Sequence, residues 1–162
     1  MGKIPRIYAD TSVYGGVFDA EFAKASEQMF NLVRVGALRL VTSVIVEQEI
    51  SVAPKAVRDL FEEIAQDTEV ADVTADVIAL RQAYIDAGVV VPRWSTDTMH
   101  VAVATAARCD AIVSWNLKHI VHIRRIPMYH AVNARLGFDR LEINSPLAVV
   151  GDERDETDEE ET

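Results

Sequence analysis

Short apolar runs and longer amphipathic runs alternate along the chain, which predicts strands and helices in alternation. Compact apolar runs bounded by turn or charged residues predict strands at 6–9, 38–41, 111–114 and 141–143, with a weaker β-like run at 69–73. Apolar residues at helical spacing predict helices at 22–35, 44–50, 55–66, 75–87, 95–109 and about 118–136. Hydroxyl residues and glycines at 11–16 predict a loop directly after the first strand.

The order of these elements predicts an α/β fold. Strands that alternate with helices form right-handed βαβ units, which place the strands in a parallel sheet with helices on both faces. The helix at 95–109 is nearly apolar all round, so we expect it to be buried. With 162 residues, of which 49% are hydrophobic, the chain is long enough for one core, and we expect a single domain over residues 1–151.

Composition and charge indicate where the protein is located and which part of the chain carries its negative charge. The sequence has no apolar stretch long enough for a membrane helix and no secretory signal, and its single cysteine, Cys109, can form no internal disulfide. We therefore expect a cytoplasmic protein without membrane contact. The net charge is −10, but residues 152–162 hold eight acids and one arginine, a net −7 that leaves −3 for residues 1–151. This acidic end has no apolar residue to bury, which predicts a disordered tail.

Four polar residues lie where such a sheet presents side chains to a ligand. Asp10 and Asn116 follow predicted strands, Glu49 lies beyond another strand, and Asp97 stands at the start of a helix. Three carboxylates brought together repel one another, and a divalent cation offsets that cost most readily. Oxygen ligands suit Mg²⁺ or Mn²⁺, and a magnesium ion held by carboxylates suits phosphodiester hydrolysis. Each acid taken alone also has a structural explanation that involves no ligand. Asp10 can be a turn residue, Asp97 a helix N-terminal charge and Glu49 a solvated side chain.

Several motifs together resemble the PIN-domain nucleases, a family that includes the VapC-like toxin ribonucleases of bacterial toxin–antitoxin pairs. The resemblance spans about residues 4–150 and rests on YADTSVYGG, TSVIVEQEI, STDTMHVAVATAARCDAIVSWNLKHI, YHAVNARLGF and INSP. It implies a three-layer α/β/α sandwich with a central parallel sheet, and metal-assisted hydrolysis of RNA by an activated water. It also implies a small antitoxin protein as partner and a homodimer.

The resemblance also assigns site residues to positions of this chain. The first, second and third acids of the family match Asp10, Glu49 and Asp97, so these three side chains are expected to hold Mg²⁺ or Mn²⁺. The hydroxyl position beside the first acid falls on Thr11 or Ser12, which are expected to contact the substrate.

Asn116 departs from the family pattern. It stands where many relatives carry a fourth acid, and Ser114, two residues earlier, resembles a residue that lines the substrate site. An amide oxygen carries no charge, so Asn116 is expected to weaken metal binding or to restrict the site to one ion. Glu47 is the fallback for the role of Glu49, because residues two apart on a helix point in different directions and only one can enter the site.

The resemblance therefore implies a magnesium-dependent endoribonuclease and, within that family, the toxin of a type II toxin–antitoxin pair. The expected catalytic residues are Asp10, Glu49, Asp97 and Asn116. The alternative is a PIN-like module that binds RNA or a protein without cutting it, because Asn116 weakens the metal site.

Basic and histidine side chains near the end of the chain admit two interpretations. Lys118, Arg124 and Arg125 are candidate phosphate contacts, although solvated helix charges need no such role. His119 and His122 lie three apart on a predicted helix and lack an obvious third metal ligand, so they are expected to be surface or packing residues. A further histidine, one turn after Asp97, either orients that carboxylate or packs in the core; we favour packing and leave His100 out of catalysis.

Overall fold

The computed structural model describes residues 2–151, and the tail predicted at 152–162 lies outside this range. Its centre is a sheet of five strands, all parallel, in the order β3-β2-β1-β4-β5. The strands are β1 (Arg6–Ala9), β2 (Arg39–Ser43), β3 (Thr68–Ala71), β4 (Ala111–Val113) and β5 (Glu142–Asn144). Every predicted strand is present within a few residues of its predicted bounds, and the parallel sheet is confirmed.

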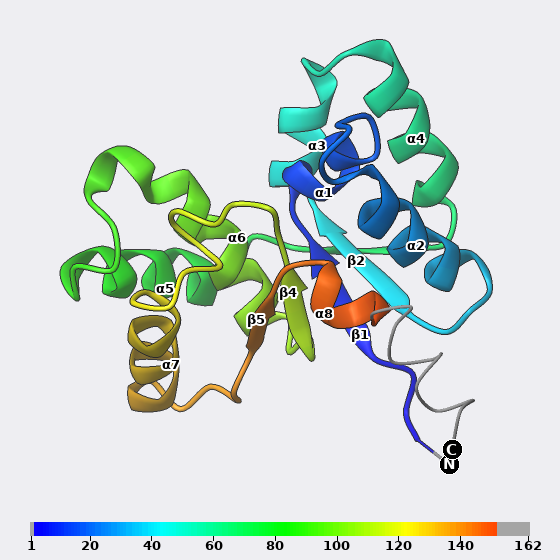
Figure 1. The fold of residues 1–162 in the computed structure, drawn as a ribbon. Coiled ribbons are helices and arrows are strands. Elements are labelled where there is room, and N and C mark those ends of the chain that lie inside the picture. The colour runs from blue at the N-terminus through cyan, green and yellow to red at the C-terminus, as the bar shows by residue number, and fades with distance from the viewer. Residues whose placement is uncertain (1, 152–162) are drawn as a thin grey trace.

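Helices connect the strands and cover both faces of the sheet. They are α1 (Thr11–Gly16), α2 (Ala23–Arg34), α3 (Val44–Ser51), α4 (Lys55–Ala65), α5 (Ala75–Asp86), α6 (Ser95–Ala106), α7 (Ile126–Arg135) and α8 (Leu147–Val150), with a 3-10 turn η1 (Pro92–Trp94). Figure 1 shows α5, α6 and α7 together on one side of the sheet and α1 to α4 on the other. This is the three-layer α/β/α sandwich that the sequence predicts. Within residues 2–151, no helix has the length and apolar character needed to cross a membrane.

The core extends over both faces of the sheet, and α6 is the most deeply buried helix on one of them. Residues 101–104 of α6 are fully buried, as are Tyr8 and Ala9 of β1 and Ile112 and Val113 of β4. Helix α6 can be buried because His100 is its only ionisable residue after the first turn, and His100 pairs with Glu49. The prediction of a buried helix is confirmed.

Two local predictions are wrong, and both errors have the same cause. Residues 11–16 form the helix α1 and not a loop, because Asp10 is its N-cap and accepts from the Ser12 backbone N at 3.2 Å. The helix predicted from about residue 118 begins only at Ile126, with a proline in its first turn. In the intervening turn, Asn116 Oδ1 accepts from the backbone N of Lys118 and His119 at 3.3 and 3.0 Å. In both places a short polar side chain bonds to nearby backbone: Asp10 caps a helix, whereas Asn116 closes a turn, and α7 itself begins without a side-chain cap.

Gly16 allows α1 to lie close to the chain that leaves β4. A Cβ added at Gly16 would stand 2.6 Å from Ser26 Oγ and 2.8 Å from Trp115 Nε1, so any larger residue would force these groups apart. Trp115 Nε1 donates to Ser26 Oγ at 2.8 Å, and its ring stacks on Phe22 at 4.3 Å between centroids. These contacts hold Trp115 beside the end of α1 and the start of α2.

Candidate functional site

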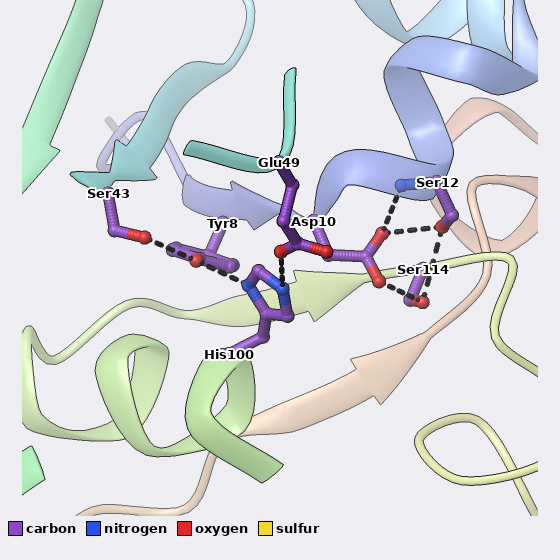
Figure 2. Close-up of polar contacts among 7 residues, drawn as sticks. All are labelled: Tyr8, Asp10, Ser12, Ser43, Glu49, His100 and Ser114. Carbon is purple, nitrogen blue, oxygen red and sulfur yellow. Dashed lines mark hydrogen bonds and ion pairs between the residues drawn. The ribbon is translucent and has the colours of Figure 1, made fainter. Parts of the chain in front are cut away.

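The carboxyl ends of β1, β2 and β4 lie side by side, and polar side chains follow each of them. Asp10 comes directly after β1, Ser43 ends β2 and leads into α3 with Glu49, and Ser114 follows β4. Because all three strands are parallel neighbours, these residues meet at one edge of the sheet. Figure 2 shows them converging there, with His100 of α6 between Tyr8 and Glu49.

Asp10 is buried, with 5% of its surface exposed, and hydroxyl groups hold both of its carboxylate oxygens. Ser12 Oγ donates to Oδ1 at 2.5 Å, and Ser114 Oγ donates to Oδ2 at 2.6 Å. Burial raises the pKa of Asp10 above its usual range, although these hydrogen bonds and nearby His100 oppose the rise. The carboxylate is thus rigidly placed, while its charge is only partly compensated.

Glu49 is held by a chain of side chains that reaches into the core. His100 Nε2 donates to Glu49 Oε1 at 2.6 Å, His100 Nδ1 lies 2.8 Å from the Tyr8 hydroxyl, and that hydroxyl lies 2.8 Å from Ser43 Oγ. Burial alone would raise the pKa of Glu49, but the contact with His100 outweighs it and holds this pKa below the usual value. Glu47 of the same helix is exposed, so of the two glutamates it is Glu49 that enters the cluster.

Asp97 has a histidine partner of its own. His119 Nδ1 lies 2.8 Å from Asp97 Oδ2, and the His119 ring stacks on Trp94 with centroids 4.9 Å apart. Asn116 contributes indirectly, because its side chain caps the turn that carries His119. His119 is therefore a buried partner of Asp97, and it does not share a helix with His122 as the sequence predicted.

His100 links the three acids electrostatically. Burial alone would lower the pKa of His100, yet the hydrogen bond to Glu49 and the charges of Asp10, Glu49 and Asp97 raise it above its ordinary value. The side chains of Asp10 and Asp97 thus act on the same imidazole, from the same edge of the sheet. A protonated His100 supplies part of the positive charge that three gathered carboxylates need.

Whether a divalent cation suits this site depends on the donor atoms of Asp10, Glu49 and Asp97. Among residues 2–151, no three His, Cys, Asp or Glu side chains lie close enough together, as they stand, to hold a metal ion. The donors nevertheless suit a hard cation, because they are carboxylates and burial raises the pKa of Asp10, a cost that a nearby cation would offset. Beside it, Thr11 Oγ1 is buried without a hydrogen-bond partner. Glu49 and Asp97 engage only one oxygen each with histidine, so both retain a second oxygen outside these pairs.

The hydroxyl residues that the sequence marks as substrate contacts serve mainly Asp10. Ser12 Oγ, besides donating to Asp10, accepts from Trp115 N at 2.9 Å, and Ser114 Oγ accepts from Asn116 N at 2.9 Å. The two serines therefore lock the loop after β4 onto the first carboxylate. Only Thr11 keeps a hydroxyl that its neighbours leave unsatisfied.

The sequence underrated both histidines of the site. The sequence predicts that His100 packs in the core, and it is buried there, but it also pairs with Glu49, which is 51 residues away. His119 was expected at the surface or in simple packing. The spacing of Asp97 and His100 on one helix face was a usable signal for His100, whereas no local signal links Asp97 to His119.

The basic residues considered as phosphate contacts are placed differently from one another. Lys118 and Arg124 are exposed, whereas Arg125 is half-buried and its Nε has no hydrogen-bond partner. Lys118 Nζ lies over the Trp94 ring, 5.9 Å from its centroid and next to the Asp97–His119 pair.

Comparison with known proteins supports the fold. No protein-family model matches the sequence, and no curated protein matches it. Ten chains of solved structures match it, including one from the crystal structure of VapBC2 from Rickettsia felis bound to a DNA fragment from their promoter. The TM-score is 0.53 at 17% identity, and the match covers 76% of this chain and 94% of that chain. At this identity the likeness bears on the fold, and the PIN-like α/β fold that the sequence predicts is confirmed.

Proposed function

We propose that this chain is a magnesium-dependent endoribonuclease that hydrolyses RNA phosphodiester bonds. The observation that carries the proposal is the placement of Asp10, Glu49 and Asp97, from three separate segments, at the carboxyl edge of the sheet, where serine or histidine side chains hold each of them. An acid cluster in this position, on a PIN-like fold, suits a hard cation and a phosphodiester. Mg²⁺ or Mn²⁺ is the proposed cofactor, with these three residues as its ligands.

Each acid has a distinct part in this proposal. A bound divalent cation supplies the activation of water and the positive charge that phosphodiester hydrolysis needs. Asp10 offers a carboxylate fixed by Ser12 and Ser114. Glu49 and Asp97 are oriented by His100 and His119, respectively. In this arrangement the histidines would hold the two carboxylates in position, and a bound cation would supply further counter-charge.

Thr11 and Asn116 have supporting parts. Thr11 lies beside Asp10 with a buried hydroxyl, and its contact with Glu49 helps to lower the pKa of that carboxyl, so its proposed part is to support the second carboxylate. Asn116 uses its amide oxygen on the backbone of Lys118 and His119, so its role is to position the turn that carries His119. An amide at this place fits a site with a single ion.

The second candidate function is a module that binds RNA or protein without cutting it. Two observations favour it: the fourth acidic position is Asn116, and Asp10, Glu49 and Asp97 are already bonded to serine or histidine side chains. The two candidates share their surface and differ only in whether the carboxylates act on the substrate.

The likeness to a VapBC2 chain also suggests partners. That structure holds VapBC2 with a DNA fragment from their promoter. For this chain we propose a small antitoxin protein as partner, a homodimer as the assembly, the cytoplasm as the location, and the role of toxin in a type II pair.

RNA cleavage distinguishes the two candidates. The wild-type chain is incubated with RNA in Mg²⁺ and in EDTA, beside Asp10→Asn, Asp97→Asn and the control Asp59→Asn, an exposed acid on α4 that pairs with Lys55. The nuclease proposal expects cleavage only with Mg²⁺, abolished in the two site variants and kept in Asp59→Asn. Binding of RNA without cleavage by the wild-type chain would favour the module.

A further inference from the structure

The two tryptophans of the chain are placed in opposite ways. Trp115 is packed against Phe22, and its indole N–H donates to Ser26. Trp94, at the end of η1, is 37% exposed, and within residues 2–151 its indole N–H makes no hydrogen bond. Trp115 is a structural residue, whereas Trp94 presents a large aromatic ring with an unused donor at the surface.

The surroundings of Trp94 are cationic although the chain as a whole is acidic. Arg93 Cζ lies 5.0 Å and Lys118 Nζ 5.9 Å from the centroid of the Trp94 ring, and both side chains are exposed. On the protein side the ring rests on His119, with planes inclined by 29°. His119 in turn holds Asp97, so a single side chain separates this aromatic platform from the proposed metal ligands.

We propose that Trp94, Arg93 and Lys118 form a subsite for one unpaired nucleobase of an RNA strand, with the indole as the stacking surface. This inference rests on the proposed function and adds a place where the substrate is held. Aromatic rings stack on any base because every base has a π-face, and flanking cations meet the backbone phosphates. The exposed Arg93 guanidinium gives up its place on the ring to the base and remains within reach of the phosphate beside it. An RNA base held here is separated from Asp97 by the indole and by His119, on which the indole rests.

A competing explanation assigns Trp94 a purely protective role, in which the indole shields the Asp97–His119 pair from water. A shield needs apolar volume, whereas a stacking platform needs a π-face. Trp94→Leu keeps the apolar cover and removes the ring, and Trp94→Phe keeps a ring. The two substitutions therefore separate the explanations.

Binding is measured in the Asp10→Asn background so that RNA remains intact. A short fluorescent single-stranded RNA and the matching duplex are titrated with the chain carrying Trp94, Trp94→Phe or Trp94→Leu, and anisotropy gives Kd. We expect Trp94→Leu to raise Kd for the single strand about 5- to 150-fold, the loss that one stacked base produces, and Trp94→Phe to raise it much less. Duplex binding should be the same in all three, because paired bases are not free to stack.

The two cations are tested through the salt dependence of binding. Arg93→Gln and Lys118→Gln should each reduce the slope of log K against log salt by about 0.7, as expected for one phosphate contact on a single strand. The control Arg39→Gln removes an exposed arginine at the start of β2, at the opposite edge of the sheet, and should leave the slope unchanged.

The outcomes separate this inference from the proposed function. Binding that neither Trp94→Leu nor Trp94→Phe changes would overturn the subsite and support the shield, and equal weakening by the two variants or equal effects on single strand and duplex would also overturn the subsite. Metal-dependent cleavage by the wild-type chain together with unchanged binding in Trp94→Leu would leave the nuclease standing without the subsite. A wild-type chain that neither binds nor cleaves RNA overturns both.

Discussion

The two edges of the sheet use carboxylates in opposite ways. At the amino edge, where β1 begins, Arg6 donates to both oxygens of Glu69 at 2.7 and 3.1 Å and to the carbonyl of Ala107 at 2.9 Å. The Arg6 backbone N donates to Asp110 at 2.8 Å. A guanidinium stays charged at any physiological pH, so these acids have a permanent counter-charge.

At the carboxyl edge the acids have only weak or titratable partners. Asp10 meets two serine hydroxyls, and Glu49 and Asp97 each meet an imidazole. Within residues 2–151, none of these three carboxylates is paired with a lysine or arginine. The difference teaches that the amino edge is built to stabilise the fold, whereas the carboxyl edge leaves negative charge available to a cation.

The largest expected effect comes from exchanging one acid at each edge for its amide. Asp10→Asn should lower the RNA cleavage rate by more than about 100-fold, exceeding the loss usual for residues that only support a metal ligand. Its unfolding free energy should change little, because an amide of the same shape removes a buried charge. Asp110→Asn should leave cleavage intact and lower the unfolding free energy by about 1 kcal/mol. Equal loss of activity in Asp10→Asn and Asp110→Asn would contradict the proposed difference between the two edges.

His100→Ala should affect both cleavage and stability. Without His100, Glu49 loses its hydrogen-bond donor, and we expect a 10- to 100-fold loss of metal affinity and cleavage. The cavity and the broken hydrogen bonds should also lower the unfolding free energy by about 1–3 kcal/mol. Chemical denaturation and metal titration on one preparation check both values. Unchanged metal affinity in a folded His100→Ala chain would mean that Glu49 needs no orientation.

Arg6→Met should act on stability alone. The Arg6–Glu69 pair is partly exposed and contributes little as an ion pair, but Arg6 also bonds to the carbonyls of Ala107 and Arg108. We expect the unfolding free energy to fall by about 1–2 kcal/mol, measured by denaturant titration. Cleavage at a temperature where the variant is fully folded should match wild type, and a tenfold loss would show that the edges are coupled.

The smallest expected effect concerns alkylation of Cys109. Its rate measures local unfolding at the amino edge of the sheet. Burial raises the pKa of its thiol from 9.0 to about 12, with nearby Arg6 opposing the rise. Since the thiolate is the nucleophile, alkylation at pH 8 to 9 should be slow in the folded chain and fast after unfolding. The unfolded thiol loses its proton above about pH 9 while the folded one keeps it, so this group makes stability fall as pH rises from there. Rapid alkylation of the native chain would contradict the burial of this edge.

Much of the fold follows from the sequence because the strands are apolar and compact. The run RIYA predicts β1 at Arg6–Ala9 without error, and the apolar helix at 95–109 is indeed buried. The errors at 11–16 and 118–125 arose where side-chain caps by Asp10 and Asn116 override the local pattern of apolar residues. Such caps depend on a few atoms and leave no periodic signal.

The sequence predicts the acids of the candidate site, but it does not predict which histidines pair with them. Asp10, Glu49 and Asp97 follow strands or begin a helix, so the topology of a parallel sheet is enough to bring them to one edge. The pairs Glu49–His100 and Asp97–His119 join segments 51 and 22 residues apart. Which acid meets which histidine depends on how α6 and the turn before α7 pack on the sheet, and sequence spacing does not encode that packing.

Calorimetric titration of Mg²⁺ into the RNA-free chain tests the central claim most directly. The acids at the carboxyl edge are proposed to exchange histidine and serine partners for a cation, which should give one saturable binding step in the wild-type chain. That step should be absent in Asp10→Asn and retained in Asp110→Asn. A wild-type chain without saturable Mg²⁺ binding, or an Asp10→Asn chain that binds equally well, would contradict the account.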